Sequence, residues 1–232
     1  MFHRFAAYAS PKHFYHKTRW LGSYLAIISL ILLIAGIYSG LWLAPADYQQ
    51  GEAFRIMYIH VPSAFLAMGI YMIMASCALI SLVWRIKLAA VWMKASSEIG
   101  IWFTFLALFT GAVWGKPMWG TWWIWDARLT SVLILFFLYL GIIALQSSIR
   151  DQEVKDRAGA ILVLVGVVNI PIIHYSVVWW NTLHQGASIS RFQKPAIDNS
   201  MLYPLLIMII AFFIFYLMVA LMRTRNEILW RE

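Results

Sequence analysis

Six long runs without a charged residue divide this chain, and they limit its possible folds more than any other feature of the sequence. A helix of about 20 residues, rising about 1.5 Å per residue, crosses a hydrocarbon core of about 30 Å. A spanning segment must also pair its own backbone polar groups, which favours helices. We therefore predict an all-α integral membrane protein with six transmembrane helices, forming a single membrane domain over residues 1–232. The expected helices lie near residues 20–43, 58–84, 98–114, 129–149, 158–180 and 201–222.

The composition supports a membrane protein and excludes several classes of function. Hydrophobic residues make up 62% of the chain and charged residues 12%, whereas soluble domains are about half apolar and about a quarter charged. The single cysteine, Cys77, lies inside an apolar run, so there is no internal disulfide, no CxxC pair and no CxxCH site for c-type haem attachment. The segment GAVWGKP is one residue too short between its glycines for a phosphate-binding loop, so no nucleotide site is expected. The chain also lacks a nucleophile–base pair or carboxylate dyad, and we assign no catalytic residue.

Lysine and arginine are divided unevenly between the two sets of loops. Thirteen of the eighteen lie before the first expected helix, in residues 85–97, in residues 150–157 or after residue 222, and five lie in the other loops. Cytoplasmic loops carry the excess of these residues, so we expect both termini to be cytoplasmic. The net charge of +8 then reflects topology and contact with anionic membrane lipid, and not a nucleic-acid partner.

This topology places three unusual features at the external membrane surface. His60 lies at the external end of the second expected helix, His184 lies just past that of the fifth, and a tryptophan-rich loop spans residues 114–128. Neutral imidazole is a good ligand for iron, copper or zinc, and two opposed imidazoles suit the iron of haem. A single histidine in such a place is more often an interfacial side chain bonded to water, lipid or a carbonyl. Together, beside the loop, the two histidines form a candidate metal site.

The external loop is crowded with tryptophan. After Trp114, four more follow within seven residues: Trp119, Trp122, Trp123 and Trp125. The first three of these four and Asp126 recur at i, i+3, i+4 and i+7, which predicts a short amphipathic interfacial helix in the loop. An aromatic belt at headgroup level explains one or two tryptophans per loop. A cluster this dense favours a platform for a large planar or cationic ligand, with membrane anchoring as the alternative.

The polar residues around the loop also have two interpretations each. Asp126 directly precedes the fourth expected helix, where aspartate is a favoured N-cap. Arg128 could bind carboxylates through its fork of N–H donors, or could reach phospholipid headgroups. The other basic residues of this side are Arg55, Lys116, Arg191 and Lys194. His174, inside the fifth expected helix, is expected to join a structural hydrogen-bond network with Asn169 and the carbonyl that Pro171 leaves free.

Three stretches of the sequence resemble the signature of the CcmC family of haem-handling membrane proteins: WGKPMWGTWWIWDARLT, HVPSA before it and HYSVVWWNTLHQGAS after it. The resemblance covers nearly the whole chain, whereas the other proteins with a WWD motif, CcmF and the CcsA type, are larger. It implies a protein of the bacterial inner (cytoplasmic) membrane that holds haem b at the periplasmic face during cytochrome c maturation. It further implies transfer of this haem to the chaperone CcmE, together with the ABC components CcmA and CcmB and the small membrane protein CcmD.

The resemblance also implies roles for individual residues. His60 and His184 match the two axial ligands of the haem iron. The segment that holds the haem and meets CcmE is matched by Trp114, Trp119, Trp122, Trp123, Trp125, Asp126 and Arg128. Contacts with the haem propionates are implied for basic residues of the external face, Arg55 and Arg128 among them.

A membrane transporter whose aromatic cage binds a cationic solute is the alternative function, because a dense group of indoles also attracts cations. Haem binding needs the histidine pair, whereas a cation cage does not. A third interpretation is a scaffold for an ABC complex, in which the loop tryptophans would be dispensable. The visible spectrum of the purified protein distinguishes the first two functions.

Overall fold

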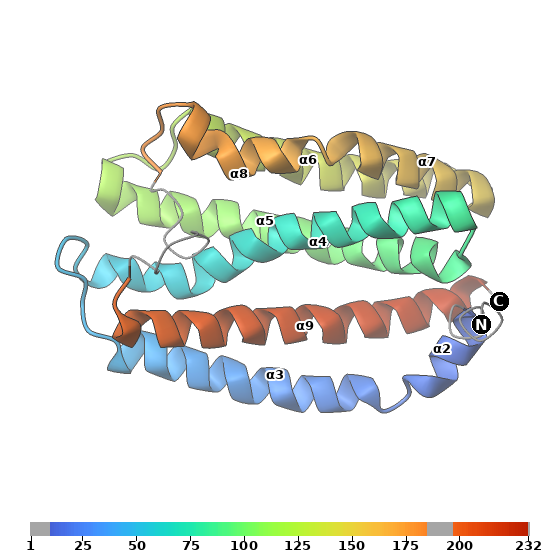
Figure 1. Ribbon diagram of the computed structural model, residues 1–232, viewed down its shortest axis with the longest axis horizontal. Helices are drawn as coiled ribbons and strands as arrows, with labels where there is room; N and C mark the ends of the chain where they lie inside the picture. The colour runs from blue at the N-terminus through green and yellow to red at the C-terminus, as the bar shows by residue number, and fades with distance from the viewer. Residues whose placement is uncertain (1–9, 185–196, 232) are drawn as a thin grey trace.

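The computed structural model describes residues 10–184 and 197–231, and this part of the chain is almost entirely helical (Figure 1). The α-helices are α2 (Pro11–Lys17), α3 (Leu21–Tyr38), α4 (Met57–Trp84), α5 (Lys87–Trp119), α6 (Ala127–Ser148), α7 (Gln152–Gly166), α8 (Asn169–Trp179) and α9 (Asn199–Arg231). A π-helical turn, η1 (Ser39–Leu43), extends α3, and a 3-10 helix, η2 (Glu52–Ile56), leads into α4. Six helical segments of the described residues are long and apolar enough to cross a membrane. The predicted all-α fold with six transmembrane helices is therefore confirmed.

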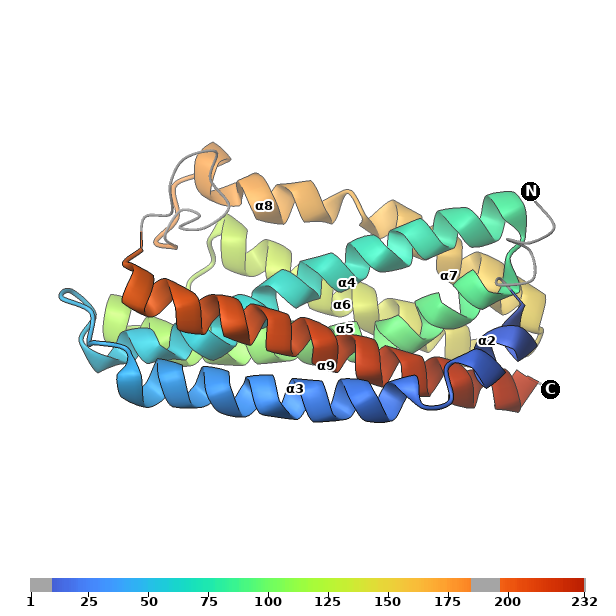
Figure 2. The same ribbon diagram turned by 60° about the horizontal axis from the view of Figure 1, so that its bottom comes forward.

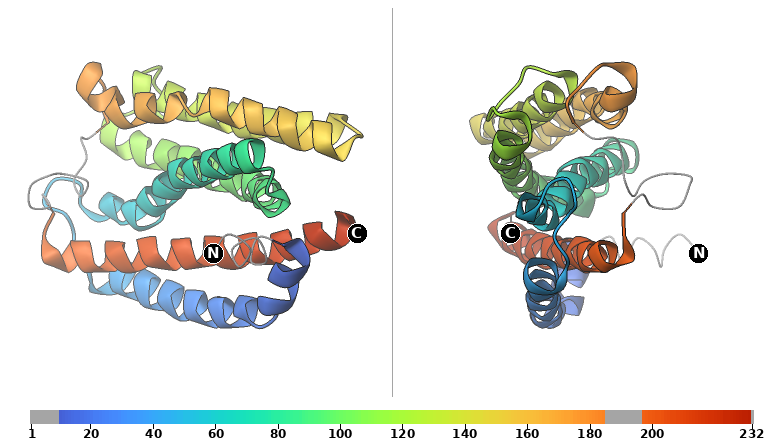
Figure 3. Two further views of the ribbon diagram at one scale, coloured as in Figure 1. Left: turned by 45° about the vertical axis from the view of Figure 1, so that its right-hand side comes forward. Right: turned by 90° about the vertical axis from the view of Figure 1, so that its left-hand side faces the viewer.

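The helices form three layers, which are visible from the side and from the end (Figures 1 and 3). Helices α3 and α9 pair along one edge, α4 and α5 cross the middle, and α6 covers the other edge together with α7 and α8. Because α3 packs chiefly against α9, most of its surface is exposed, and its exposed side chains are largely apolar. Such a surface suits contact with lipid. The main buried core lies around α4, which has neighbours on both sides.

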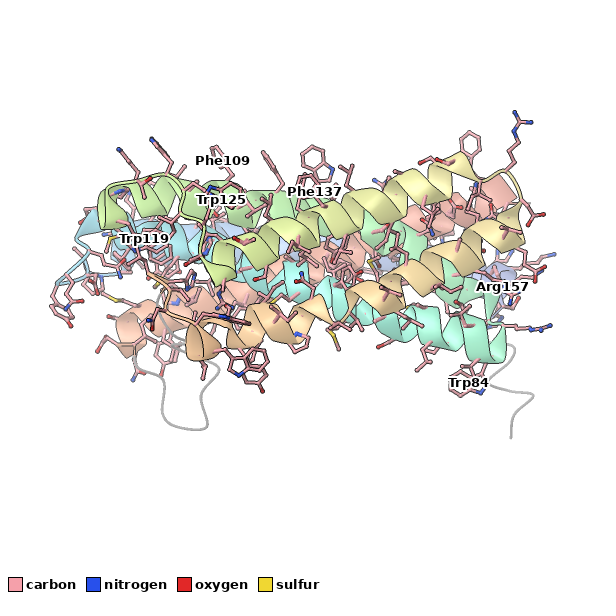
Figure 4. All side chains as sticks on the ribbon, turned by 90° about the horizontal axis from the view of Figure 1, so that it is seen from above. Trp84, Phe109, Trp119, Trp125, Phe137 and Arg157 are labelled. Carbon is pink, nitrogen blue, oxygen red and sulfur yellow. The ribbon has the colours of Figure 1, made fainter. Side chains whose placement is uncertain are left out.

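The first and last described residues, 10 and 231, lie at the same end of the bundle (Figure 1). The Arg225 side chain of α9 donates a hydrogen bond to the carbonyl of Tyr15 in α2, and its guanidinium lies 4.1 Å from the Tyr15 ring centroid. Arg157 also lies at this end, whereas Trp119 and Trp125 lie at the opposite end (Figure 4). The tryptophan-rich loop and the described chain ends are thus separated by the full length of the helices.

The expected bounds of the third helix, 98–114, are wrong at both ends, because α5 extends from Lys87 to Trp119. Its first turns carry charged residues, two of which are paired with residues of α9. Lys94 lies 2.7 Å from Glu227, and Glu98 pairs with Arg223. An uncharged run marks only the part of a helix that suits hydrocarbon, whereas paired charges let α5 continue beyond it.

The expected fifth helix, 158–180, is divided into α7 and α8 at residues 167–168 (Figure 2). Pro171 has no N–H group, so the Val167 carbonyl loses its helical donor at the break. The buried side chain of Asn169 donates to the Ser131 carbonyl of α6 at 2.9 Å. Helix α8 consequently packs on α6 and diverges from α4 towards the end that carries the tryptophan-rich loop (Figures 1 and 2).

A glycine and a buried tyrosine join three helices near the middle of the bundle. Tyr139 of α6 is fully buried and lies against Gly100 of α5, where a β-carbon would overlap its ring. The Tyr139 hydroxyl donates to the Ala67 carbonyl of α4 at 2.8 Å. The ring of Tyr71 meets that of Tyr139 edge-on, with centroids 5.2 Å apart. These contacts fix α4, α5 and α6 relative to one another, and the same three helices carry most of the candidate site.

Candidate functional site

Two histidines from different helical segments meet at the end of the bundle that carries the tryptophan-rich loop. His60 is in the first turn of α4, and His184 lies shortly beyond the end of α8. Their ring centroids are 6.3 Å apart, and the ring planes are inclined at 38°. Imidazoles on opposite sides of one metal ion, each bonded at about 2 Å, have ring centres about 6 Å apart. The pair therefore has the spacing of two axial ligands.

The histidine pair suits a metal that brings further ligands with it. Structural zinc sites take four protein ligands and catalytic sites three. In the two described ranges of the chain, no three His, Cys, Asp or Glu side chains come together, and residues 185–196 include none of these types. The iron of haem is already held by the nitrogens of its porphyrin and needs only axial ligands from a protein. The donor set thus fits haem better than a bare ion.

Helix α5 provides a close cradle for His60. The Thr110 hydroxyl lies 3.1 Å from Nδ1 of His60. A β-carbon at Gly111 would lie 3.0 Å from Cε1 of the same ring, so the glycine allows close packing. The indole of Trp114 meets the imidazole edge-on, with centroids 5.6 Å apart. The three residues are spaced i, i+1 and i+4, which places them on one side of α5.

Trp114 is held in turn by the turn that connects the first two spans. Its Nε1 donates to the side-chain carbonyl of Gln50 at 3.0 Å. The turn is shaped by Asp47, whose carboxylate accepts hydrogen bonds from the backbone N–H groups of Gln49 and Gln50. Neither Gln50 nor Thr110 was predicted from the sequence. The only sequence signal for Thr110 is its position one helical turn before Trp114. Nothing in the sequence points to Gln50.

The loop tryptophans separate into an inner and an outer set. Trp119 faces the site, with its ring centroid 6.5 Å from that of His184. Trp123 is half-buried and packs edge-on against Trp125, with centroids 5.5 Å apart. Trp122 and Trp125 are 56% and 78% exposed. Only part of the cluster can therefore contact a ligand held by the histidines, while Trp122 and Trp125 present an outward aromatic surface.

The expected short interfacial helix in this loop is wrong. Trp119 is the last residue of α5, and residues 120–126 form bends and irregular backbone. Gly120 ends the helix with φ of +77°, a conformation that glycine adopts at little cost. Its N–H bonds to the Lys116 carbonyl at 3.1 Å, and its own carbonyl accepts from the Lys116 ammonium at 3.0 Å. The i, i+3, i+4, i+7 spacing therefore spans a helix end.

The predicted N-cap of the fourth transmembrane helix is confirmed. One carboxylate oxygen of Asp126, Oδ1, accepts from the backbone N–H of Leu129 at 2.7 Å. The other, Oδ2, is buried and has no hydrogen-bond partner among the described residues. Asp126 therefore fixes the point where the loop turns into α6, and it has an acceptor oxygen to spare.

We expect Asp126→Ala to destabilise the folded protein by about 1 kcal/mol, because an orphan N–H of α6 loses its acceptor. Asp126→Asn should remain within a few tenths of a kcal/mol of the wild type, since asparagine caps as well as aspartate. Thermal unfolding in detergent, followed by size-exclusion chromatography, measures both. Equal destabilisation by the two variants would contradict a capping role and indicate that the charge or Oδ2 is needed.

The basic residues of this end are engaged in contacts within the chain. Arg128 donates to the carbonyl of Ile173 and so ties α6 to α8. Arg55 pairs with Glu52 and donates to the Gly40 carbonyl at 2.8 Å. The candidates Arg191 and Lys194 lie outside the described residues. Arg128 and Arg55 thus have structural contacts that an anionic ligand would have to share or displace.

The structure places His174 in the middle of α8. Its side chain is exposed on α8, and its ring meets that of Tyr175 edge-on, with centroids 4.8 Å apart. Asn169, expected to belong to the same hydrogen-bond network, bonds instead to Ser131. His174 therefore faces the surroundings of the bundle.

Two clefts of the described residues lie at the opposite end of the molecule. They are lined by charged residues of α5, α7 and α9, among them Lys94, Glu227 and Arg231. Neither histidine lines these clefts, and their polar walls do not suit a flat apolar ligand. We place the candidate site at the histidines, because their geometry and neighbours specify a ligand chemistry.

Comparison with known proteins identifies the relatives of the chain. The family described as CcmC, heme exporter protein C, matches residues 4–232. Heme exporter protein C of Haemophilus influenzae is 54% identical over 222 residues, covering 96% of this chain and 90% of that protein. The Escherichia coli K12 protein of the same name is 53% identical over 224 residues, covering 97% and 90%. A putative cytochrome c biosynthesis ccmC-like mitochondrial protein of Marchantia polymorpha is 46% identical over 198 residues, covering 85% and 84%.

Proposed function

We propose how this chain, which belongs to the CcmC (heme exporter protein C) family, performs its haem-handling role in cytochrome c maturation. It binds haem b with His60 and His184 as the axial ligands of the iron. The haem lies at the periplasmic face of the bacterial inner membrane and passes from there to the chaperone CcmE. The observation that carries the proposal is the 6.3 Å separation of the two imidazoles beside Trp114 and Trp119.

The chemistry of haem matches the surroundings of this pair. Haem is a flat aromatic ring with two carboxylates on one edge, and indoles pack well against such a surface. Trp114 and Trp119 each lie beside one of the two histidines. Arg128 and Arg55 are the charged groups suited to the propionates. Binding a propionate would then either draw the Arg128 guanidinium away from the Ile173 carbonyl or leave it donating to both groups.

The membrane orientation follows from the charge distribution. The end that holds the described termini carries most of the lysine and arginine residues, so it faces the cytoplasm by the positive-inside rule. The histidine end then faces the periplasm. A site at the lipid–water boundary leaves one edge of the haem accessible to a partner, as handover requires.

The outer tryptophans of the loop suggest where a partner protein binds. Trp122 and Trp125 face outward and form the docking surface for CcmE, because exposed aromatic residues of this kind commonly dominate binding energy at protein interfaces. The chain works with other components of the maturation system, namely CcmA, CcmB and CcmD. Energy from ATP enters through the ABC components.

The visible spectrum of the purified protein tests this function. We expect a red protein with the absorption bands of low-spin haem held by two histidines. A colourless protein that takes up no added haem, but binds quaternary ammonium compounds, would overturn the proposal in favour of a cation cage.

Replacing both outer tryptophans should separate docking from haem retention. We expect Trp122→Ala with Trp125→Ala to keep the low-spin spectrum and to weaken CcmE binding at least about tenfold, since buried interface tryptophans often contribute 2 kcal/mol or more. Trp119→Ala is the matched inner variant, and it should loosen haem while CcmE still docks. Haem spectra and binding of labelled CcmE to the protein in nanodiscs measure both. Equal docking by the double variant and the wild type would exclude this surface.

A further inference from the structure

The Thr110 hydroxyl has one proton, and its contacts determine where that proton points. The oxygen lies 2.6 Å from the Leu106 carbonyl, one turn earlier in α5, and 3.1 Å from Nδ1 of His60. A carbonyl oxygen can only accept a hydrogen bond, so Thr110 donates to Leu106. The bond to His60 must then run the other way, with the imidazole as donor and the threonine oxygen as acceptor. Nδ1 of His60 therefore carries the ring hydrogen.

We infer that Thr110 is a positioning residue for haem, holding His60 in the tautomer that can bind iron through Nε2. The inference rests on the proposed function of His60 as an axial ligand. A neutral imidazole has one N–H and one lone pair. With its hydrogen on Nδ1 and bonded to Thr110, the ring keeps the lone pair on Nε2 for the metal.

The neighbours of Thr110 reinforce this arrangement. Gly111 lets α5 approach the Cε1 edge of the ring, and Trp114 closes another edge. The imidazole is thus confined by three residues of one helix face, of which only Thr110 offers a side-chain acceptor to Nδ1. The ring also has a hydrogen bond to the backbone carbonyl of Ala107, one turn earlier in α5. Rotation of the ring would replace this bond with an apolar contact. Thr110 consequently supplies the side-chain acceptor that holds His60 in this orientation, beside the Ala107 carbonyl.

A hydrogen bond from Nδ1–H makes the imidazole a stronger electron donor to a metal. A stronger donor stabilises ferric iron more than ferrous iron, which lowers the reduction potential of the haem. Loss of the acceptor should therefore raise the potential and weaken the hold on ferric haem. Groups that accept a hydrogen bond from a metal-binding histidine typically contribute about 10–100-fold in metal affinity. A tenfold selective loss of ferric haem affinity corresponds to about 59 mV for a one-electron couple.

Thr104 provides a matched control in the same helix. Its hydroxyl is buried and donates to the Gly100 carbonyl at 2.7 Å, the same bond that Thr110 makes to Leu106. Thr104 lies six residues before Thr110, about 9 Å further along α5 from the histidine pair. Thr104→Val therefore removes an equivalent hydroxyl from α5 without touching His60, whereas Thr110→Val removes the side-chain acceptor of His60 and leaves the Ala107 carbonyl in place. Thr110→Ser keeps a hydroxyl at the position.

The test compares purified, haem-loaded wild type with these three variants. The measurements are the visible spectrum, the reduction potential from a reductive titration, and the rate of haem transfer to excess apomyoglobin. Thr110→Val should stay low-spin, shift its potential upward by about 59 mV and release ferric haem about tenfold faster. Thr110→Ser and Thr104→Val should behave like the wild type. If Thr110→Val is not recovered folded, Thr110→Ala against Thr110→Ser makes the same comparison.

Each other outcome overturns the inference. An unchanged potential in haem-loaded Thr110→Val removes the role of the hydroxyl while leaving the histidine ligands in place. An equal shift in Thr110→Ser or Thr104→Val assigns the effect to packing in α5. A wild-type protein without a bis-histidine spectrum contradicts the proposed function itself, and the inference falls with it.

Discussion

His60→Ala and His184→Ala should each abolish the low-spin haem spectrum and lower haem affinity by more than about 100-fold. The reason is that each removes an iron–nitrogen bond, a larger loss than the about 10–100-fold associated with residues that only support a ligand. The remaining histidine leaves iron with an open axial position, so any haem that stays bound should become high-spin. Absorption spectra of the purified variants, titrated with haem, measure both effects.

His174→Ala is the matched control for this prediction. His174 is an exposed histidine of α8, and its ring packs edge-on against that of Tyr175. Its removal should leave spectrum and affinity unchanged. A second control is to supply imidazole to His60→Gly, because the cavity left by the side chain admits the free ligand and should restore the low-spin bands. Retention of a wild-type spectrum by His60→Ala would rule out this histidine as a ligand.

The membrane spans were predictable because hydrocarbon imposes a length and a composition on every segment that crosses it. The ends of the helices were not, since they depend on partners that are distant in sequence. Lys94 and Glu98 looked like the limit of a span, yet both are paired with α9, and α5 continues past them. Pro171 was noticed in the sequence, but the break before it depends on Asn169 bonding to α6.

The residue types that could bind a ligand were predictable from the sequence. The residues that hold them in place were not. Histidine and clustered tryptophan are uncommon enough to stand out, and topology places them on one face. Thr110 and Gln50 are ordinary polar residues whose roles exist only once α5 lies beside α4 and the connecting turn. The error over the interfacial helix has a local cause. The periodic spacing of Trp119, Trp122 and Trp123 predicts a helix, but Gly120 between them ends one.

Gly100→Ala should cost about 3 kcal/mol or more of folding free energy, although it adds a single methyl group. Overpacking a well-filled core typically costs 1–3 kcal/mol and sometimes more. Here the added carbon would overlap the ring of Tyr139, which is fully buried and cannot easily move. Moving the ring would also strain or break its hydrogen bond to the Ala67 carbonyl. We expect a marked loss of folded protein in detergent extracts and a lower unfolding temperature, measured by fluorescence-detected size-exclusion chromatography.

The same change at Gly141 of α6 is the control, because a β-carbon built there meets no atom within 4 Å beyond its chain neighbours and the nearby backbone of its own helix. Gly141→Ala should be neutral or stabilise the protein by about 0.4–1 kcal/mol, through the smaller conformational freedom of the unfolded chain.

Adding Tyr139→Ala to Gly100→Ala should cost less folding free energy than the sum of the two single changes, since both act on one contact. Because Tyr139 also joins α6 to α4, the fraction of Gly100→Ala that does fold should hold haem more weakly, with His60 displaced from α5. Wild-type stability and haem affinity in Gly100→Ala would show that the helices can separate at mid-bundle without disturbing the histidine pair.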